Sequence, residues 1–496
     1  MNKTKDLINL AKKLYEKKNF FEAKSNLLTA LKEEDLDNDY KLRLYVLLSD
    51  ICEKINEFDD AEKYLLKYVE QGKKNLKIFF SLANIYLKKR DFKKSEIFFL
   101  KALNIDKNNE ASLIGISLLY ENFGKQEEAK KFYHKILKIN PKNLAVMFNL
   151  SKIDKNFIND NLLNFVSKTL KEKKLNDFNK ASGYFLLAEN ERNKKNFGDE
   201  INYLKIGHKF AFNSRKTYNE QLLEYWLKII PKINWNNRLS DIENKQDTKN
   251  FYPIFIIGLP RSGSTLIESI ISSGKIKIDN LSETNLVNWS FLNVNKDKIF
   301  NSKLDNKEVM IDIDLTSKRL INSFKNLNIS SYNQKFFFIE KSLENFFFIE
   351  LILKIFPNAK FINPNRNYID NIFAIYTQFL NDIPWSHSID NILTYMDTYI
   401  RVIKDFKKKY PNKILSFSLE EFTDKPEEFS KKIFNFCELE WDSKCLEFYK
   451  RDDFFSKTAS NNQIRTNIKR YNEKKYLSYK EILNDYSNQY NWLDQN

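Results

Sequence analysis

A period of 34 residues runs through the first third of this 496-residue chain. The pattern is a polar turn followed by a small residue, and it recurs with Ala61, Ser95 and Ala129 spaced 34 positions apart. A unit of this length cannot bury its apolar face alone, so neighbouring units must stack to form one core. The period therefore predicts a stack of antiparallel helix pairs, which is an all-α solenoid.

The residues inside each unit support this prediction. Small side chains recur where the two helices of a unit should cross, at Ser49, Ala61, Ala83, Ser95, Ser117 and Ala129. Large ones recur where neighbouring units should stack, at Leu65, Tyr86, Phe99, Tyr120 and Tyr133. An earlier copy centres on Ala23, and Pro141 follows the fourth unit. The pattern resembles the tetratricopeptide repeat, which implies a groove that receives a peptide or protein partner.

The period is lost after residue 150, where the chain changes character. A further helix pair is predicted between Tyr184 and Lys209, with its turn at residues 196–198. An Asn-rich polar connector follows from Tyr218 to residue 250. We therefore predict three parts, which are tetratricopeptide repeats over 1–150, an irregular helical region with a further repeat and a connector over 151–250, and a third domain over 251–496.

The third domain opens with an apolar strand that runs into a glycine-rich loop and then an amphipathic helix. Gly258 to Thr265 fits the phosphate-binding pattern G-x-x-x-x-G-K-[ST], except that Ser264 replaces the lysine. That lysine normally reaches the β and γ phosphates of a nucleoside triphosphate, so its loss argues against a nucleotide kinase or an ATPase. The backbone N–H groups and the helix N-terminus still favour a phosphate or a sulfate. The loop therefore predicts another anionic nucleotide.

The sequence from Phe255 to Glu268 resembles the 5′-phosphosulfate loop of sulfotransferases, especially bacterial ones with N-terminal tetratricopeptide repeats and the related tyrosylprotein sulfotransferases. The resemblance implies a P-loop-like α/β domain whose parallel sheet binds the donor at its carboxyl edge. It also implies 3′-phosphoadenosine 5′-phosphosulfate (PAPS) as sulfuryl donor, without a metal. The loop residues that it implies for donor binding are Arg261, Ser262, Gly263, Ser264 and Thr265.

A second segment, from Phe356 to Tyr376, resembles the 3′-phosphate site of the same family. Arg366 stands where the family places an arginine that grips this phosphate, whereas Ala374 replaces the serine expected eight residues later. The loss of one hydroxyl donor should weaken donor binding by about 0.5 to 1.5 kcal/mol. Asn371 and Tyr376 are the candidate residues to supply the missing hydrogen bond to the 3′-phosphate.

The resemblance further implies two residues that carry the transfer. Glu283 stands where the family has its catalytic glutamate, and Lys341 matches a lysine at the end of an apolar strand. Sulfuryl transfer to a hydroxyl needs a base for the acceptor proton and a cation for the transferring group. No histidine lies in this register. His387 follows in a loop that could line the acceptor cleft, but an ordinary surface position is the favoured interpretation.

The C-terminal part resembles the family more diffusely. Ser460, in the run Thr458-Ala459-Ser460, matches a serine that approaches the sulfate. Lys469 or Arg470 matches the basic residue that closes over the donor. Leu419 is a departure, because it replaces the tyrosine that usually ends a strand.

Composition limits the remaining classes of function. The formal charge of +16 is spread over the whole chain, which is typical of solvated surface and argues against nucleic-acid binding. The three cysteines and three histidines have no spacing for a disulfide framework or a metal site. No apolar run is long enough to span a membrane, and the first residues do not form a signal peptide. A reduced, cytoplasmic protein is therefore predicted.

Together these features predict a PAPS-dependent sulfotransferase that acts on a hydroxyl acceptor, with the repeats recruiting substrate or partner. The acceptor class stays open among protein, sugar, lipid and small molecule. The alternative is a non-catalytic repeat scaffold with a degenerate nucleotide-binding domain. Ala374 and Leu419 are the residues that favour this alternative.

Overall fold

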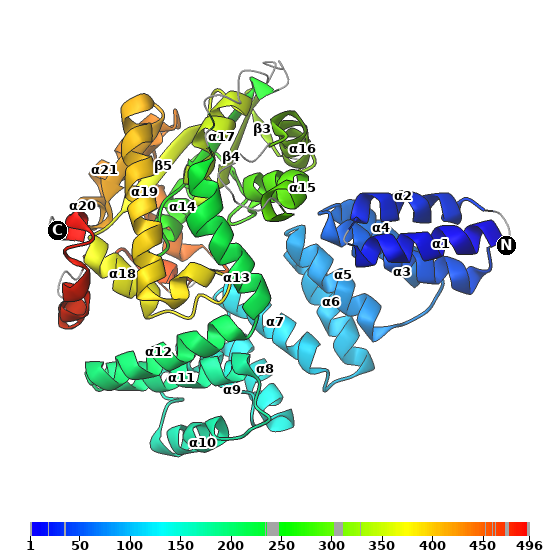
Figure 1. Ribbon diagram of the computed structural model, residues 1–496, viewed down its shortest axis with the longest axis horizontal. Helices are drawn as coiled ribbons and strands as arrows, with labels where there is room; N and C mark the ends of the chain where they lie inside the picture. The colour runs from blue at the N-terminus through cyan, green and yellow to red at the C-terminus, as the bar shows by residue number, and fades with distance from the viewer. Residues whose placement is uncertain are drawn as a thin grey trace. The chain divides into compact units, whose positions relative to one another are not determined.

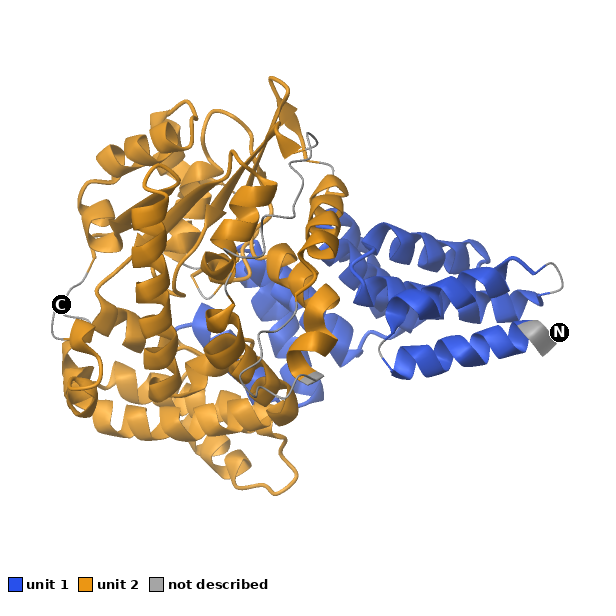
Figure 2. Ribbon diagram, turned by 45° about the horizontal axis from the view of Figure 1, so that its top comes forward, with its two compact units in different colours: residues 1–155 blue, residues 156–496 orange. Residues whose placement is uncertain are grey.

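The computed structural model describes residues 2–17, 19–33, 36–233, 235, 248–301, 311–327, 329–451, 453–458, 460–461, 463–471 and 476–493. The chain divides into two compact units, residues 1–155 and 156–496, which Figure 2 shows in different colours. The second unit begins well before the glycine-rich loop. It includes the helix pair that the sequence pattern assigned to a separate region ending near residue 250.

The first unit is made of helices, and consecutive helices pack in pairs. Its helices are α1 (Asn2–Glu16), α2 (Phe20–Leu31), α3 (Asn38–Lys54), α4 (Phe58–Glu70), α5 (Leu76–Lys88), α6 (Phe92–Ile105), α7 (Glu110–Asn122), α8 (Gln126–Ile139) and α9 (Leu144–Ile153). Side chains at several starts support them, as when Asn75 accepts hydrogen bonds from two backbone N–H groups of α5. The predicted all-α repeat architecture is confirmed.

Small residues lie where the helices of a pair cross, as predicted. Ala61 and Ala83 have no exposed surface, and Ser95 is equally buried. The Ser49 hydroxyl donates to the Ala61 carbonyl at 2.9 Å, and the Ser95 hydroxyl donates to the Ala83 carbonyl at 2.8 Å. A serine can therefore replace alanine at a crossing, because its hydroxyl finds a backbone acceptor in the partner helix.

The 34-residue period also appears in the hydrogen bonds between neighbouring repeats. The Tyr86 hydroxyl donates to Glu62 at 2.6 Å, and the Tyr120 hydroxyl donates to Glu96 at 2.5 Å. The two donors are one period apart, and so are the two acceptors. Each bond joins the second helix of one repeat to the first helix of the next. Tyr86 and Tyr120, two of the aromatic residues predicted at stacking positions, therefore lie between repeats, whereas the Tyr133 hydroxyl donates to Glu121 within its own helix pair.

The second unit is built on a six-stranded sheet with the order β2-β4-β1-β5-β6, and β3 pairs with β4. Figure 1 labels β3, β4 and β5 of this sheet. The strands are β1 (Phe251–Ile256), β2 (Asp279–Asn280), β3 (Ser331–Tyr332), β4 (Lys335–Glu340), β5 (Lys360–Asn365) and β6 (Ile414–Ser418). All pairings are parallel except that of β3 with β4. The predicted α/β domain with a parallel sheet is confirmed.

Helices surround this sheet and precede it in the chain. Before the sheet come α10 (Asp160–Leu170), α11 (Asp177–Asn193), α12 (Phe197–Asn213), α13 (Lys216–Glu224), the π-helical turn η1 (Tyr225–Ile229) and η2 (Ile230–Lys232). The helices within and after it are α14 (Ser264–Ile271), α15 (Leu286–Asn301), α16 (Ile313–Lys325), η4 (Leu343–Phe348), α17 (Ile349–Ile355), α18 (Tyr368–Tyr376), η5 (Pro384–His387), α19 (Ile389–Lys409), α20 (Leu419–Asp424), α21 (Pro426–Phe436), η6 (Ser443–Lys450), η7 (Gln463–Arg465), η8 (Leu477–Tyr486) and η9 (Asn491–Leu493).

The core of the second unit explains why the strands read as continuous apolar runs. Ile254 and Ile256 of β1 pack in one buried cluster with Ile267, Ile270 and Ile271 of α14. A parallel sheet covered on both faces needs apolar residues at successive positions. This packing also holds the start of α14 at the carboxyl edge of the sheet. Among the described residues, no helix has the length and apolar character needed to cross a bilayer.

Candidate active site

The glycine-rich loop lies between β1 and α14 at the carboxyl edge of the sheet. Three of its residues have positive φ angles, which are 136° at Gly258, 67° at Arg261 and 92° at Gly263. A Cβ at Gly263 would lie 2.6 Å from a methyl carbon of Leu419, so both the backbone angle and the available space require glycine there. The residue that departs from the family pattern, Leu419, thus packs directly against the loop.

Arg261 and Ser460, which are 199 residues apart, come together at this loop. The Nη1 of Arg261 donates to the Ser460 hydroxyl at 2.5 Å, while the Nε of Arg261 is buried without a hydrogen-bond partner. Next to them, the Thr265 hydroxyl donates to the Thr458 hydroxyl at 3.2 Å. Burial lowers the pKa of Arg261, because the side chain has lost much of its contact with water. Ala459, which lies between Thr458 and Ser460 in the sequence, is outside the described residues.

Lys341 and Glu283 form an ion pair at the ends of neighbouring strands. Lys341 directly follows β4, and its backbone N–H donates to the Ser282 carbonyl at 2.8 Å, which aligns the loop after β2. The Lys341 ammonium lies 2.5 Å from Glu283 and 3.6 Å from Glu268. Lys341 is fully buried, whereas 45% of the Glu283 side chain is exposed. The carboxylate of Glu283 can therefore meet a ligand from solvent while it rests on a buried cation.

The charge on Lys341 depends on its two acidic neighbours. Burial opposes the ammonium, but the attraction of Glu283 and Glu268 outweighs it and raises the pKa of Lys341 to about 12. Burial raises the pKa of Glu268, and the nearby ammonium lowers it. One carboxylate oxygen of Glu268 is buried without a hydrogen-bond partner. The sequence analysis missed Glu268 as a site residue, although an acidic side chain on the apolar helix α14 was a visible signal.

A second buried acid, Glu340, fixes the loop that carries Glu283. It accepts hydrogen bonds from Thr284 at 3.1 Å, from Asn345 at 2.5 Å and from the Ser342 hydroxyl. Burial raises the pKa of Glu340 to about 7, although these hydrogen bonds lower it. The residue is thus a buried support for the β2 and β4 loops rather than a group open to solvent.

Arg366 lies at the end of β5, where the sequence placed the 3′-phosphate site. Its Nη1 donates to the Arg261 carbonyl at 3.1 Å, so the two arginines are linked. Its other Nη pairs with Asp370 at 3.6 Å and donates to the Tyr471 hydroxyl, which in turn donates to Asp370. The Nε of Arg366 is buried without a hydrogen-bond partner. Tyr471 directly follows Lys469 and Arg470 in the sequence, and its contact with Arg366 is visible only in the structure.

The two candidate replacements for the missing serine differ in their surroundings. Ala374 is buried on α18 and offers no donor. The Asn371 amide donates to the Pro260 carbonyl of the loop at 2.9 Å, and its carbonyl oxygen has no hydrogen-bond partner. The Tyr376 ring instead stacks on His208, with the ring centroids 4.4 Å apart. Of the two, Asn371 is the residue in contact with the loop.

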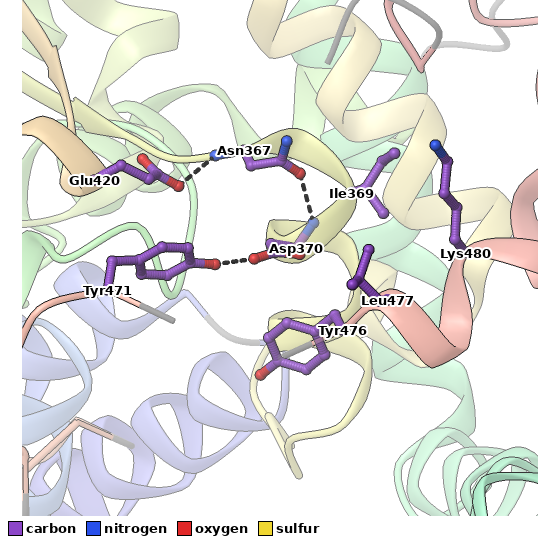
Figure 3. Close-up of a pocket in the computed structure, with 8 residues that line it drawn as sticks. All are labelled: Asn367, Ile369, Asp370, Glu420, Tyr471, Tyr476, Leu477 and Lys480. Carbon is purple, nitrogen blue, oxygen red and sulfur yellow. Dashed lines mark hydrogen bonds between the residues drawn. The ribbon is translucent and has the colours of Figure 1, made fainter. Parts of the chain in front are cut away.

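Figure 3 shows a pocket of about 330 Å³. Three residues that contact Arg366, which are Asp370, Tyr471 and Tyr476, belong to its lining. Its lining residues come from α18, α20 and the C-terminal segment, and they are Asn367, Ile369, Asp370, Glu420, Tyr471, Tyr476, Leu477 and Lys480. The Asn367 backbone N–H donates to Glu420 at 2.9 Å, and its side-chain oxygen accepts from the Asp370 N–H at 3.1 Å. These bonds set the first turn of α18, which carries one wall of the pocket.

The predicted closing residues are both at the surface. Arg470 forms an ion pair with Asp424, with Nε 2.7 Å from the carboxylate, and 80% of its side chain is exposed. Lys469 is exposed as well. The next residue, Tyr471, is the one that reaches Arg366. The donor-closing role of Lys469 or Arg470 stays a prediction.

The favoured interpretation of His387 as a surface residue is wrong. Only 8% of its surface is exposed, and its Nδ1 lies 3.0 Å from the Nδ1 of His208, a residue of α12. The Nε2 of His208 faces the Tyr376 carbonyl at 2.8 Å, so this nitrogen carries the proton, and the Nδ1 of His208 accepts a hydrogen bond from the Nδ1–H of His387. Burial lowers the pKa of His208 to about 3 and that of His387 to about 4. Both imidazoles are therefore neutral structural groups.

Among the described residues, one cluster has the composition of a metal site, and it lies in the first unit. It consists of Cys52, Glu57 and Asp60. The Lys24 ammonium pairs with both carboxylates and lies 2.6 Å from Asp60. A lysine cation therefore already balances the negative charge of this cluster.

Two family models match parts of the chain. The model of the tetratricopeptide repeat matches residues 42–71, 76–109 and 111–143, and the model of the sulfotransferase family matches residues 253–443. These matches confirm the resemblance predicted from the sequence for both parts.

Individual relatives resemble this chain over about half of its length. An uncharacterized protein of Aquifex aeolicus (strain VF5) is 28% identical over 258 residues, which are 47% of this chain and 31% of that protein. The sulfotransferase domain of the Synechococcus PCC 7002 olefin synthase is 17% identical, with a TM-score of 0.34, over 46% of this chain and 87% of that domain. A tetratricopeptide repeat protein from Parabacteroides merdae ATCC 43184 is 18% identical, with a TM-score of 0.33, over 48% of this chain and 96% of that protein.

Proposed function

Because this chain combines tetratricopeptide repeats with a domain that matches the sulfotransferase family, we propose that it transfers a sulfuryl group from PAPS to a hydroxyl acceptor. The observation that carries the proposal is the ion pair of Lys341 and Glu283 beside the glycine-rich loop. A half-exposed carboxylate next to a buried, fully charged ammonium provides a base and a cation at one place.

The residues of the loop fit a donor with two anionic ends. The N-terminus of α14 favours one phosphate or sulfate group, since its backbone N–H groups have no helical partners. Two buried guanidinium nitrogens, Nε of Arg261 and Nε of Arg366, have no hydrogen-bond partner among the residues that the structure describes. Arg261 with residues 262–265 would hold the 5′-phosphosulfate, and Arg366 with Asn371 the 3′-phosphate. PAPS supplies the activated sulfuryl group when it is bound.

The proposed reaction is an in-line displacement at sulfur. The acceptor oxygen forms a bond to sulfur while the bond from sulfur to the 5′-phosphate oxygen breaks, so 3′-phosphoadenosine 5′-phosphate leaves. The Glu283 carboxylate takes the acceptor proton. Lys341, Ser460 and the loop offset the negative charge that moves toward the leaving phosphate. The buried Glu268 holds Lys341 from the opposite side and keeps its ammonium charged.

The direct test is the variant Glu283→Gln, which keeps the size of the side chain and removes the base. We expect transfer to fall by about 10² to 10⁴-fold, since this is the usual contribution of a general base. Binding of 3′-phosphoadenosine 5′-phosphate, measured by calorimetry, should stay within twofold of the parent. Full activity of this variant would exclude Glu283 as the base. Absence of any binding to the parent protein would favour the alternative, a non-catalytic repeat scaffold.

The repeats and the acceptor form the second part of the proposal. We propose that the repeats recruit a protein or peptide to the transferase domain, as their match to the tetratricopeptide repeat supports. Incubation of candidate proteins, sugars, lipids and small molecules with ³⁵S-labelled PAPS would identify the acceptor class by transfer of the label. The cytoplasmic location stays a prediction.

A further inference from the structure

A buried ion pair lies in the helix pair that precedes the sheet, outside the residues matched by the sulfotransferase model. The Nε of Arg192, at the end of α11, is 2.7 Å from one carboxylate oxygen of Glu200 on α12. The Glu200 side chain has no exposed surface. A carboxylate in such a place is costly unless its oxygens are satisfied, so its partners show what the pair holds together.

The partners of this pair are two elements of the transferase domain. The second oxygen of Glu200 accepts a hydrogen bond from the Tyr479 hydroxyl at 2.6 Å, which ties α12 to η8. The Nη2 of Arg192 donates to the Thr377 carbonyl at 3.2 Å, directly after α18. The Tyr479 ring also stacks on Phe373 of α18, with the ring centroids 5.1 Å apart. One buried pair therefore joins η8 to α18.

Both elements contribute residues to the lining of the pocket (Figure 3). Helix α18 contributes Ile369 and Asp370, and the C-terminal segment contributes Tyr476, Leu477 and Lys480. The Tyr476 ring lies 5.7 Å from the Arg366 guanidinium. The position of η8 thus decides both the width of the pocket and the cover over Arg366.

The two walls are held unequally. Helix α18 has a second tie to the helix pair, because the Nε2 of His208 on α12 donates to the Tyr376 carbonyl at 2.8 Å, in addition to the bond from Arg192 of α11. Segment η8 is tied to α12 by the Tyr479 hydroxyl and by the edge contact of its ring with Phe197, at 5.3 Å between centroids. At its other end, η8 is held to α19 (Ile389–Lys409) by the Tyr486 hydroxyl, which donates to Asp390 at 3.1 Å. Loss of the Glu200 contact should therefore loosen the Tyr479 end of η8, which lines the pocket, and leave α18 in place.

We infer that Glu200 is a positioning residue for the donor pocket, which it shapes by holding η8 against α18 through Tyr479. The inference rests on the proposed function, because it assigns this pocket to the nucleotide donor. It also makes α11 and α12 a structural part of the transferase, although their spacing resembles a further repeat. The pair acts through other residues and does not touch the reacting atoms.

The test compares two variants of the full chain with a matched control. Tyr479→Phe removes the hydroxyl and keeps the ring, and Glu200→Gln keeps the shape of the side chain. The control is Tyr86→Phe in the repeats, because Tyr86 has the same exposed fraction of 2% and the same 2.6 Å bond to a glutamate. Calorimetry with 3′-phosphoadenosine 5′-phosphate, well below the melting temperature, gives the dissociation constant of each protein, and thermal unfolding gives its stability.

We expect Tyr479→Phe and Glu200→Gln to bind the nucleotide about fivefold more weakly than the parent, and Tyr86→Phe to bind it as the parent does. A lower melting temperature of Tyr479→Phe with unchanged nucleotide affinity would overturn the inference, since a merely structural contact would give that result. If Glu200→Gln does not fold, Tyr479→Phe decides. If the parent does not bind the nucleotide at all, the proposed function fails first, which is a different result from equal affinities.

Discussion

The two units of this protein use the same contact in opposite ways. In the repeats, the Tyr86 hydroxyl bonds Glu62, 24 residues earlier, and the contact recurs one period later. In the second unit, the Tyr479 hydroxyl bonds Glu200 across 279 residues. The first contact is local and repeated, so its loss should affect one interface between repeats. The second occurs between distant segments and shapes a pocket. The Tyr86–Glu62 and Tyr479–Glu200 hydrogen bonds have the same length of 2.6 Å. The first therefore stabilises one interface between repeats, and the second positions the wall of a pocket.

The largest difference in stability between the two units should come from replacing a lysine that forms ion pairs in each of them. Lys341→Met leaves Glu268 buried without its cation, so we expect a loss of about 3 to 5 kcal/mol in the free energy of unfolding. Transfer should be lost as well. Denaturant unfolding measures the first effect. The variant Lys341→Met with Glu268→Gln should recover part of the stability, because no unpaired charge remains in the core.

Lys89 in the repeats is the matched control for this change. Its ammonium also meets two carboxylates, at 2.5 Å from Asp59 and in contact with Glu62, but 25% of its side chain is exposed. Lys89→Met should cost less than about 1 kcal/mol, because water can solvate the groups left behind. Equal losses for the two lysines would show that burial does not distinguish these ion pairs.

Replacing one glycine by alanine in each unit should cost less stability than the lysine substitution in the second unit. A Cβ would lie 2.4 Å from the Phe99 ring at Gly115 and 2.6 Å from Leu419 at Gly263, where φ is also 92°. Each substitution should destabilise its unit by about 1 to 3 kcal/mol. Only Gly263→Ala should abolish calorimetric binding of 3′-phosphoadenosine 5′-phosphate, because it changes the loop backbone. Loss of binding in Gly115→Ala would contradict this separation.

The smallest effect concerns pH. Burial raises the pKa of Glu340 to about 7, above its ordinary value of 4.5, so the folded protein keeps a proton that the unfolded chain releases. Its contribution to stability is therefore present below pH 4.5 and is lost as pH rises toward 7. Glu340→Gln should make the free energy of unfolding less dependent on pH in this window. Unfolding in urea at several pH values measures it, and an unchanged slope would contradict the assignment.

The sequence predicted the parts of this protein whose causes are local. The period of 34 residues is visible because each repeat makes the same contacts, as the small residues at Ala61, Ala83 and Ser95 show. The loop from Gly258 to Thr265 is recognisable because its backbone angles demand glycine at set positions. The parallel sheet was implied by the family resemblance of this loop, and its apolar strands are consistent with burial on both faces. The sequence also placed Arg261 and Ser460 in one predicted site.

Other features depended on contacts that no local pattern records. Glu268 resembles any helical glutamate until the fold places it 3.6 Å from Lys341. His387 and His208, treated as separate residues, form a buried pair across 179 positions. Both contacts join buried polar side chains. A buried polar group without a hydrogen-bond or ionic partner is costly, so such groups are found together in the core.

The sequence by itself thus determined the repeats, the strand, the glycine-rich loop and the helix after it, and the types of side chain available for chemistry, because period and backbone angle act over a few residues. Tertiary structure alone decided that α11 and α12 belong to the same unit as the sheet, that Lys341 is a buried cation between two acids, and that Tyr471 and Tyr476 line the pocket. These outcomes depend on which distant segments share one core, and a buried charge must find its partner there.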